Sequence, residues 1–508
     1  MRVRVLRGVL LFGLVLIVLV CGGGATAMGW LWSRAVVSTA GEIDFVNRLA
    51  VPPLAPSTVD KDGQRVFTLT AGEGRHDFGG GPVDTWGFNG DYLGPTLRAS
   101  RGEQVAVRVR NDLSEPTSVH WHGMHLPAKM DGGPHQPVAP GATWTPSWKV
   151  DQPAATLWYH PHPHGETAKH VYRGLAGMFI VDDPGTSADL PDTYGVDDIP
   201  VIVQDKQLRD DELDDSPDVM SDVGILGDTI AVNGTVAPYQ QVTTERVRLR
   251  LLNGSTARVY HFGFADDRRF ALVGTDGGLL PAPHHTRRVT LSPGERAEIV
   301  VTMRPGERTV LRSFPPPLGL DGLSERFAGG DDTLDVLQLR AAGRLAASPE
   351  LPRTLVDVPR LDPDDAAQRR TFQLGGNRIN AHKMALDRLD AVVTKDTTEI
   401  WEVTNADGTP HSFHVHDVQF QVLSVDGGAP PPQLSGWKDT LYLPPNVEFS
   451  LIMRFADYAD PDTPYMFHCH VLFHEDAGMM GQFVVVAPGQ RPGTPAVPAH
   501  DGHGGHGG

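Results

Sequence analysis

Cysteine is nearly absent from this chain of 508 residues, which has two, Cys21 and Cys469. Cys21 falls within an N-terminal apolar run, so we expect no structural disulfide, and Cys469 is then a free thiol. A buried, inert thiol is one interpretation of Cys469. The histidines on both sides of it, His468 and His470, favour a metal ligand instead.

Basic residues and helical periodicity are also scarce. Lys and Arg total 44 against 62 Asp and Glu, and the net charge of −18 argues against a nucleic-acid partner. The 56 glycines and 42 prolines accompany short alternating runs, such as 66–70 and 104–110, with turn signals between them. This pattern is typical of β-sandwiches, and the chain is too long for one core. The sequence therefore predicts an all-β protein of about three domains.

The N-terminus has the pattern of an export signal. Arg2, Arg4 and Arg7 precede an apolar stretch at 9–20, and Ala25-Thr26-Ala27 is a candidate cleavage site. The apolar character resumes weakly at 30–32, so an uncleaved membrane anchor is an equal alternative. We expect an exported protein, extracellular or periplasmic, either released or anchored to the cell membrane.

Composition shifts divide the chain further. Breaks rich in proline, glycine and charge separate three strand-rich regions, and the C-terminus is a His/Gly-rich, low-complexity tail. The tail histidines, His500, His503 and His506, either hold metal loosely or have no role. The predicted segments are 1–27 (signal peptide or anchor), 28–60 (stalk), 61–185 (first domain), 199–345 (second domain), 346–370 (linker), 371–488 (third domain) and 489–508 (disordered tail).

An internal repeat supports this division. In the first and third domains a His-x-His pair begins nine residues after an asparagine that ends a valine-rich strand. In the middle domain aromatic residues take the places of both histidines. The three copies are Asn111 with His120 and His122, Asn253 with Phe262 and Phe264, and Asn405 with His414 and His416.

Four His-x-His pairs occur in the first and third domains. Successive side chains on a strand point to opposite faces, so each pair presents two imidazoles on one face. Eight imidazoles are too many for one metal ion but suit a cluster of three coppers; zinc, the nearest rival, does not require so many ligands. The pairs are His120/His122, His160/His162, His414/His416 and His468/His470.

The residue between His468 and His470 points to the other face. Cys469 can gather there with His474 and Met479, which follow it, and with His411, whose position three residues before His414 gives it the opposite orientation. A thiolate, two imidazoles and a distant thioether describe a blue-copper electron-transfer site.

These motifs resemble those of the multicopper oxidases, the laccase-like enzymes built from three cupredoxin domains. The motifs are His120-Trp121-His122-Gly123, Trp158-Tyr159-His160-Pro161-His162, Pro410-His411-Ser412-Phe413-His414-Val415-His416, and His468-Cys469-His470-Val471-Leu472-Phe473-His474 with Met479. The resemblance covers about residues 60 to 487 and implies three cupredoxin-like Greek-key β-sandwich domains with four copper ions, the middle domain holding none.

The resemblance also implies how the ligands divide among the ions. Type 1 copper would take His411, Cys469 and His474, with Met479 axial; type 2 copper His120 and His414; one type 3 copper His122, His160 and His470; and the other His162, His416 and His468. Electrons from a reducing substrate would pass through Cys469 to the cluster, where dioxygen is reduced by four electrons to water.

Three acidic residues have candidate roles by the same resemblance. Asp131 and Glu475 match positions that supply protons near the trinuclear cluster, although an exposed acid is the alternative for each. Asp439 resembles an acid near the type 1 site, where it would orient a ligand histidine or meet the substrate.

Several functions stay open at this stage. The first is oxidation of phenols or aromatic amines with dioxygen. The second is a cuprous oxidase in copper tolerance, with Cu(I) as reductant; the third domain lacks a methionine-rich insertion, but the His-rich tail keeps copper handling open. Bilirubin-type pigments and other metal ions are further substrates. A non-catalytic structural or assembly protein is disfavoured by the complete ligand set, and a copper nitrite reductase would not need all four pairs.

Overall fold

The computed structural model describes Gly29, Trp32 and residues 35–498, except 187–188, 211 and 218–221. The predicted signal or anchor at 1–27, together with Cys21 and the tail histidines, lies outside the described residues. Within the described part, no helix has both the length and the apolar character needed to span a bilayer.

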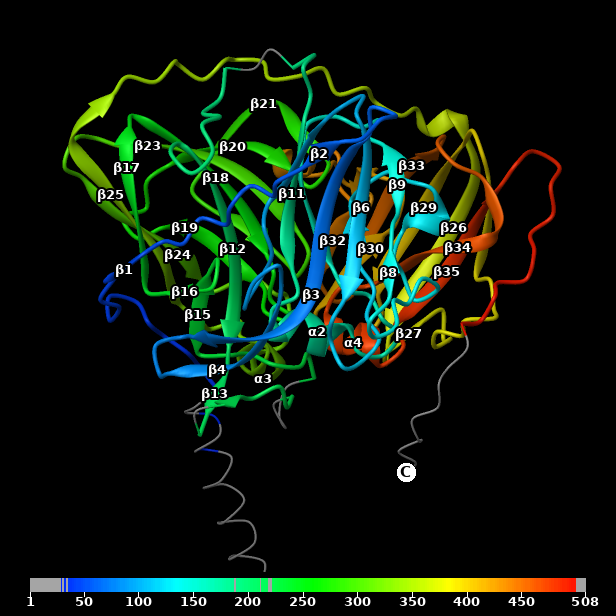
Figure 1. Ribbon diagram of the computed structural model, residues 1–508, viewed down its shortest axis with the longest axis horizontal. Coiled ribbons are helices and arrows are strands. Elements are labelled where there is room, and N and C mark those ends of the chain that lie inside the picture. The colour runs from blue at the N-terminus through cyan, green and yellow to red at the C-terminus, as the bar shows by residue number, and fades with distance from the viewer. Residues whose placement is uncertain are drawn as a thin grey trace, which may run out of the picture.

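The described strands form six large sheets, which pair face to face as three β-sandwiches (Figure 1). The predicted all-β fold is therefore confirmed. Alternation along the strands explains the sheets: in β6 (Gln104–Asn111), Val105, Val107 and Val109 are fully buried while Arg108 and Arg110 face outward.

In the first sandwich, one sheet has the order β2-β3-β6-β8, with β4 on β3 and β9 on β6, and the other has β5-β11-β10-β7. The elements are β2 (Thr58–Val59), β3 (Arg65–Asp77), β4 (Pro82–Phe88), β5 (Leu97–Ser100), β6, β7 (His120–His122), β8 (Thr143–Trp144), β9 (Ser147–Lys149), β10 (Ala155–His160), α2 (Thr167–Arg173) and β11 (Gly177–Asp182).

In the second sandwich the sheets are β1-β17-β25-β24-β19-β22 and β16-β15-β12-β18-β23-β20-β21, with a small β13-β14 ribbon beside them. The elements are β1 (Asn47–Arg48), β12 (Asp198–Lys206), β13 (Leu208–Arg209), β14 (Glu212–Leu213), β15 (Thr229–Val232), β16 (Thr235–Val236), β17 (Pro238–Thr244), β18 (Arg246–Asn253), β19 (Tyr260–Phe264), β20 (Phe270–Thr275), β21 (Gly278–Thr286), β22 (Val289–Leu291), β23 (Arg296–Thr302), β24 (Arg308–Phe314), α3 (Gly322–Phe327) and β25 (Leu334–Ala346).

In the third sandwich the sheets are β27-β26-β29-β33-β31 and β28-β35-β34-β30-β32. The elements are β26 (Ala366–Gly375), β27 (Arg378–Ile379), β28 (Ala391–Thr394), β29 (Thr397–Asn405), β30 (His411–Val415), β31 (Phe420–Val425), β32 (Thr440–Leu443), β33 (Glu448–Phe455), β34 (Asp460–Cys469), α4 (Leu472–Asp476) and β35 (Met480–Val486).

The asparagine of each repeat copy makes the same pattern of hydrogen bonds. Asn111, Asn253 and Asn405 end β6, β18 and β29, and all three are fully buried. Each side-chain oxygen accepts from the backbone N–H two residues on. Each amide donates to one carbonyl of the loop that follows and to one carbonyl of a later segment, which is that of Val138, Leu291 or Leu443. The asparagines thus fix the loops leading into β7, β19 and β30.

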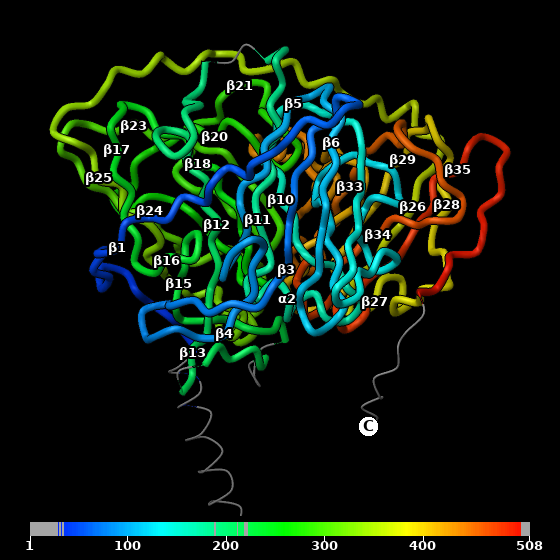
Figure 2. The backbone as a smooth tube through the Cα atoms, viewed as in Figure 1, coloured from blue at the N-terminus to red at the C-terminus, as the bar shows by residue number. Residues whose placement is uncertain are grey.

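The predicted stalk is partly incorporated into the body of the protein. Within 28–60, β1 pairs in parallel with β17 of the second sandwich, and Phe45 and Leu49 are buried. Apolar side chains in this segment favour packing over extension into solvent. The predicted linker also lies on the protein: Figure 2 shows it crossing the top of the molecule, and Leu355 is buried in the core of the second sandwich.

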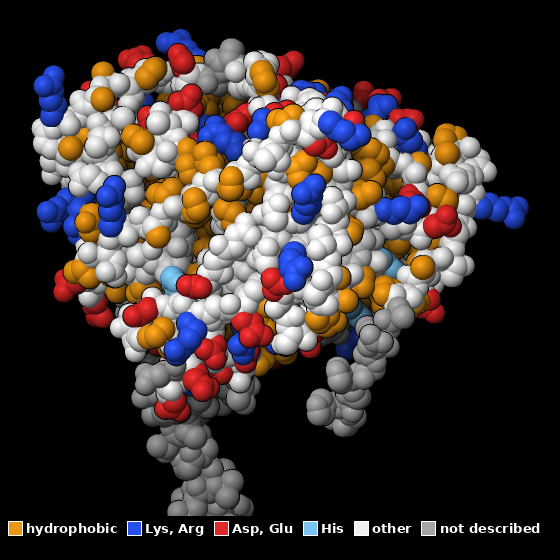
Figure 3. Space-filling model, in the orientation of Figure 1, with side chains coloured by type: hydrophobic (Ala, Val, Ile, Leu, Met, Phe, Trp, Pro, Cys, Tyr) orange, Lys and Arg blue, Asp and Glu red, His pale blue; other side chains and the backbone are white. Residues whose placement is uncertain are grey.

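The first and third sandwiches meet at the ends of their histidine-bearing strands. Next to this junction, α2 and α4 lie together, and both oxygens of the half-buried Asp476 accept from backbone N–H groups of α2, those of Thr167 and Ala168. On the face seen in Figure 3, acidic and basic side chains are interspersed, so the net negative charge is not gathered into one patch there.

Candidate metal centre

The only cysteine of the described residues lies at the end of β34, against the start of β30. Its Sγ is 3.6 Å from Nδ1 of His411 and 3.7 Å from Nδ1 of His474, and the two Nδ1 atoms are 3.2 Å apart. Cys469, His411 and His474 are all buried. Three soft or borderline donor atoms therefore converge on one point, as the alternation on the strands predicts.

Electrostatics favour the ligand form of this thiol. Burial alone would raise the pKa of Cys469, but the contacts with His411 and His474 outweigh it and lower the pKa to about 5. The thiolate is the form that binds metal. Met479 is fully buried near this cluster, and its carbonyl accepts from Cys469 N–H at 3.0 Å. Met480 pairs with His468 in the β34–β35 ladder.

The other face of β34 meets a larger cluster. All eight histidines of the four pairs are buried, with rings from β7 and β10 of the first sandwich facing rings from β30 and β34 of the third. His468 Nε2 lies 3.2 Å from Nε2 of both His162 and His416, and His160 Nε2 lies 3.4 Å from His122 Nδ1. His470 packs against this second group, with ring centroids 5.0 Å from His122 and 5.3 Å from His160.

The donor atoms of this cluster suit metal ions. Burial, followed by repulsion from neighbouring rings, lowers the pKa of His122, His160, His414 and His416 well below the ordinary value, so these imidazoles are neutral. Neutral imidazole is the metal-binding form. Several buried ring nitrogens of the cluster have no hydrogen-bond partner among the described residues; they include His120 Nε2, His414 Nε2 and both nitrogens of His470. Buried nitrogens without partners are costly unless a ligand satisfies them.

Two carboxylates lie behind the histidine rings. Asp131 Oδ2 is 2.7 Å from His416 Nδ1, and Glu475 Oε2 is 3.0 Å from His468 Nδ1. Both acids are buried, so the exposed alternative is excluded for each. Burial would raise the pKa of Glu475, but His162 and His468 lower it below the ordinary value. The two acids thus each contact a ring nitrogen of a neighbouring pair, His416 and His468.

The expectation that Asp439 lies beside the thiol cluster is wrong. Its Oδ1 is 3.1 Å from His122 Nε2, and its backbone carbonyl accepts from His414 Nδ1 at 2.8 Å. Asp439 therefore belongs to the eight-histidine cluster. It immediately precedes β32, which pairs with β30 on the side of His414, and this pairing decides its position.

The acid beside the thiol cluster is Asp407, which the sequence analysis did not single out. Its Oδ1 is 3.1 Å from His411 Nε2, so the carboxylate orients the ring whose Nδ1 faces Cys469. The available signal was its position four residues before His411, in the loop that Asn405 fixes.

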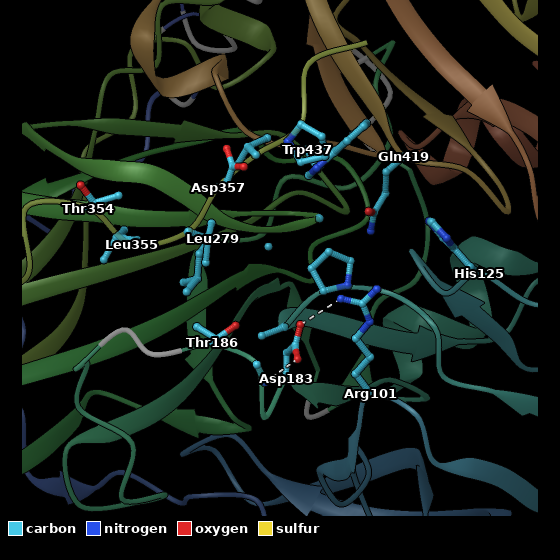
Figure 4. Close-up of a pocket in the computed structure, with 18 of the residues that line it drawn as sticks. Arg101, His125, Asp183, Thr186, Leu279, Thr354, Leu355, Asp357, Gln419 and Trp437 are labelled. Atoms are coloured by element: carbon cyan, nitrogen blue, oxygen red, sulfur yellow. Dashed lines mark hydrogen bonds and ion pairs between the residues drawn. The ribbon is translucent and has the colours of Figure 1, made fainter.

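Two cavities lie near these clusters. The larger, of about 730 Å³, sits where the three sandwiches meet; Figure 4 shows Arg101 paired with Asp183 on one side and Gln419 and Trp437 on another. Gln419 donates to the carbonyl of Gly123, next to His122, so this cavity reaches the layer behind the larger cluster. The smaller, of about 180 Å³, adjoins the thiol cluster: Asp222, one of its lining residues, accepts from His474 Nε2 at 2.7 Å.

Comparison with known proteins identifies the family. Multicopper oxidase family models match residues 70–186 and 354–489. The chain is 35% identical to multicopper oxidase mco of Staphylococcus haemolyticus over 444 residues, which are 86% of this chain and 92% of that protein. It is 38% identical to cell division protein FtsP of Xenorhabdus nematophila over 444 residues, which are again 86% of this chain and 92% of that protein.

Solved structures agree. The laccase-like multicopper oxidase CueO from Ochrobactrum sp. is 36% identical, with a TM-score of 0.79, over 86% of this chain and all of that one. A metallo-oxidase from Campylobacter jejuni is 25% identical, with a TM-score of 0.76, over 89% of this chain and 98% of that one. The chain belongs to the multicopper oxidase family.

Proposed function

We propose that this protein is a copper-dependent oxidase that couples one-electron oxidation of phenols or aromatic amines to the four-electron reduction of dioxygen to water. One observation carries the proposal: Cys469 of the buried Cys469, His411 and His474 group is bonded directly to His468 and His470 of the eight-histidine cluster. An electron donor site and a multinuclear site are thus joined through one short stretch of β34.

His411, Cys469, His474 and Met479 would hold one ion, and the sets His162–His416–His468 and His122–His160–His470 would each hold another. His120 and His414 remain for a fourth ion. Two of the assigned ligand sets coincide with groups of converging donor atoms, His411–Cys469–His474 and His162–His416–His468, whereas His122 and His160 converge with His120. The place of His470 rests on the resemblance to the family and on its ring packing against His122 and His160. Bound copper would supply one-electron redox chemistry and the site of dioxygen reduction.

The chain's own residues support this chemistry in two ways. The peptide bonds of Cys469 lead directly to His468 and His470, which gives electrons a covalent path between the two sites. Asp131 and Glu475 are the only carboxylates, among the described residues, placed within 3.5 Å of His416, His162 or His468, where they can hold protons that dioxygen reduction consumes.

The small cavity beside His474 favours an organic reductant. Its described lining includes Val223, Leu320, Leu323 and Phe327, an apolar set suited to an aromatic ring. Phe473, beside His474, is 37% exposed. A phenol in this cavity would lie near the His474 ring, which the Asp222 carbonyl holds in place.

The similarity to FtsP raises a non-catalytic role as the second candidate. Nothing in a structural role requires eight buried imidazoles, several of which have ring nitrogens without partners among the described residues, because such burial is costly without metal. The intact donor set therefore favours the oxidase.

The first test is to load the purified protein with copper and measure copper per chain, the visible spectrum, and oxygen uptake with a phenol and separately with Cu(I). A blue thiolate band with phenol-driven uptake would support the proposal. Uptake mainly with Cu(I) would move the function to copper tolerance. Full loading without a blue band or oxygen uptake would favour the non-catalytic role.

Cys469→Ser separates the two sites. We expect loss of the blue band and of substrate oxidation, because the thiolate ligand and the covalent path both depend on this residue. Copper at the eight-histidine cluster should be retained. Full oxidase activity in this variant would contradict the electron path.

A further inference from the structure

The middle sandwich contributes no histidine to either cluster, yet its β22–β23 turn touches the larger one. A Cβ atom at Gly294, which has φ +87°, would lie 3.0 Å from Cδ2 of His470. The turn is therefore packed flat against that ring. The next residue but one, Arg296, begins β23 and is fully buried.

All five N–H donors of the Arg296 side chain have acceptors, and these come from all three sandwiches. Nε donates to the carbonyl of Thr156 at 2.9 Å in the first sandwich. The two terminal nitrogens donate to the carbonyls of Gly294 and Asp276, both at 3.0 Å, in the second. They also bind the two oxygens of Asp439 in the third, at 2.7 and 2.6 Å.

Arg296 binds the carboxylate of Asp439, which in turn contacts His122. Asp439 Oδ1 contacts His122 Nε2 at 3.1 Å and accepts from Thr440 Oγ1 at 2.8 Å; Thr440 Oγ1 in turn lies 2.9 Å from His122 Nε2. With Nε2 engaged from behind, His122 turns Nδ1 toward His160 and the centre of the cluster. Partners of this kind set the orientation and tautomer of a ligand histidine.

Gly123 shows how tightly this arrangement is built. It has φ +83°, and a Cβ atom there would lie 2.5 Å from Asp439 Oδ2 and 2.8 Å from an Arg296 terminal nitrogen. No other residue type fits beside the ion pair. The glycine that follows His122 in the first motif thus has a physical explanation.

We propose that Arg296 is a positioning residue of the trinuclear site, through which the copper-free middle sandwich fixes Asp439 and so holds His122 with Nδ1 toward the metal. A lysine cannot replace it, because an ammonium has three donors and no planar fork that matches a carboxylate. The inference rests on the proposed function, since it concerns copper at that site.

The test compares Arg296→Lys with the copper-loaded wild-type protein. We expect copper binding at the eight-histidine cluster to weaken about 10- to 100-fold, with a changed signal of the copper ions of that cluster in electron paramagnetic resonance. The blue band should persist, because His411, Cys469 and His474 form that site, and it reports folding in the same sample. If wild-type protein takes up no copper, the proposed function fails; if it does, and Arg296→Lys keeps the full copper content and an unchanged signal, this inference is overturned.

Arg250→Lys is the matched control. Arg250 is also a buried arginine of the middle sandwich, makes two bonds to a buried carboxylate, Asp198, and reaches Thr156 of the first sandwich. It should keep copper and the resonance signal, and an equal loss in both variants would overturn the inference. If Arg296→Lys does not fold, Gly123→Ala separates the ion pair with both charges retained and should show the same loss at the cluster; retention of full copper would contradict the proposal.

Discussion

Asp407 occupies the position beside the thiol cluster that sequence reasoning gives to Asp439, and Asp439 lies at the eight-histidine cluster instead. Alternation on β30 and β34 placed His411 on the side of Cys469, because that geometry is local to each strand. Which acid stands behind which histidine depends instead on how β32 pairs with β30 and on the loop before His411. The β30–β32 pairing joins residues far apart in the chain, so no spacing in the sequence reveals the position of Asp439. Arg296 escaped notice for the same reason. Asp407, in contrast, lies only four residues before His411.

Asp407→Asn tests the carboxylate behind His411. The amide keeps the shape but weakens the hold on Nε2, so we expect about a 10- to 100-fold loss in substrate oxidation and a shifted blue band. The spectrum and oxygen uptake of copper-loaded protein measure both effects.

Asp426→Asn is its control, because Asp426 is exposed in the same sandwich and its Oδ1 accepts only from the backbone of Glu448 in the bonds described. It should leave the blue band in place. Equal spectra for Asp407→Asn and the wild type would contradict the assignment.

Glu475→Gln tests the buried acid between His162 and His468. The substitution preserves volume but removes the site that can hold a proton, so oxygen uptake should fall about 100-fold while copper content and the blue band are kept. Oxygen uptake with a phenol at matched copper content is the measurement. Undiminished uptake would exclude Glu475 from proton delivery.

At the scale of elements, the three strands that end in an asparagine could be predicted from the sequence. The asparagine that fixes each loop lies next to that loop in the chain. The spacing of nine residues in the sequence corresponds to the same hydrogen bonds at Asn111, Asn253 and Asn405. The middle copy keeps this scaffold with Phe262 and Phe264 in the core in place of ligands. The repeat thus shows that the fold depends on the asparagine, whereas the histidines serve metal binding.

Asn253→Ala tests the role of this asparagine in the middle sandwich, which supplies no proposed copper ligand. Two buried carbonyls and one buried N–H lose their partner, at a cost of about 1–3 kcal/mol for an unsatisfied group. This cost raises the equilibrium constant for local opening about 5- to 150-fold. Amide hydrogen exchange in β18 and β23 should therefore accelerate by the same factor. Copper content should not change.

Gln241→Ala, on the exposed face of β17, is the comparison for this experiment, since its amide bonds one carbonyl at the surface. Exchange in β18 should stay at the wild-type rate. Equal acceleration by both substitutions would show that the asparagine has no special role.

At the scale of the whole molecule, the first two sandwiches are joined through a buried charge network. Glu298 of β23 pairs with Arg248 and Arg250 and accepts from Thr156 Oγ1 of the first sandwich at 2.6 Å. Burial would raise the pKa of Glu298, but the two arginines outweigh it and lower the pKa from 4.5 to about 2.

This depressed pKa predicts how stability depends on pH. The carboxylate contributes about 3 kcal/mol that is fully present above about pH 4.5 and is lost as the pH falls toward 2. Glu298→Gln should therefore lower the unfolding temperature most above pH 4.5, and the difference from wild type should shrink in acid. Thermal unfolding across this pH range measures it.

The exposed Glu245 of the same sandwich provides the control substitution, Glu245→Gln. Its unfolding temperature should follow the wild-type curve. A difference between Glu298→Gln and wild type that is independent of pH would contradict the assigned contribution.

The eight-histidine cluster is divided between the first and third sandwiches, and this division affects the order of synthesis and metal binding. During synthesis, His120 and His162 leave the ribosome before His468, Cys469 and His470, which lie more than 300 residues later in the chain. A nascent chain that has not reached β34 therefore holds no complete ligand set. Capture of the full set of metal ions thus has to follow synthesis of the third sandwich and its closure against the first.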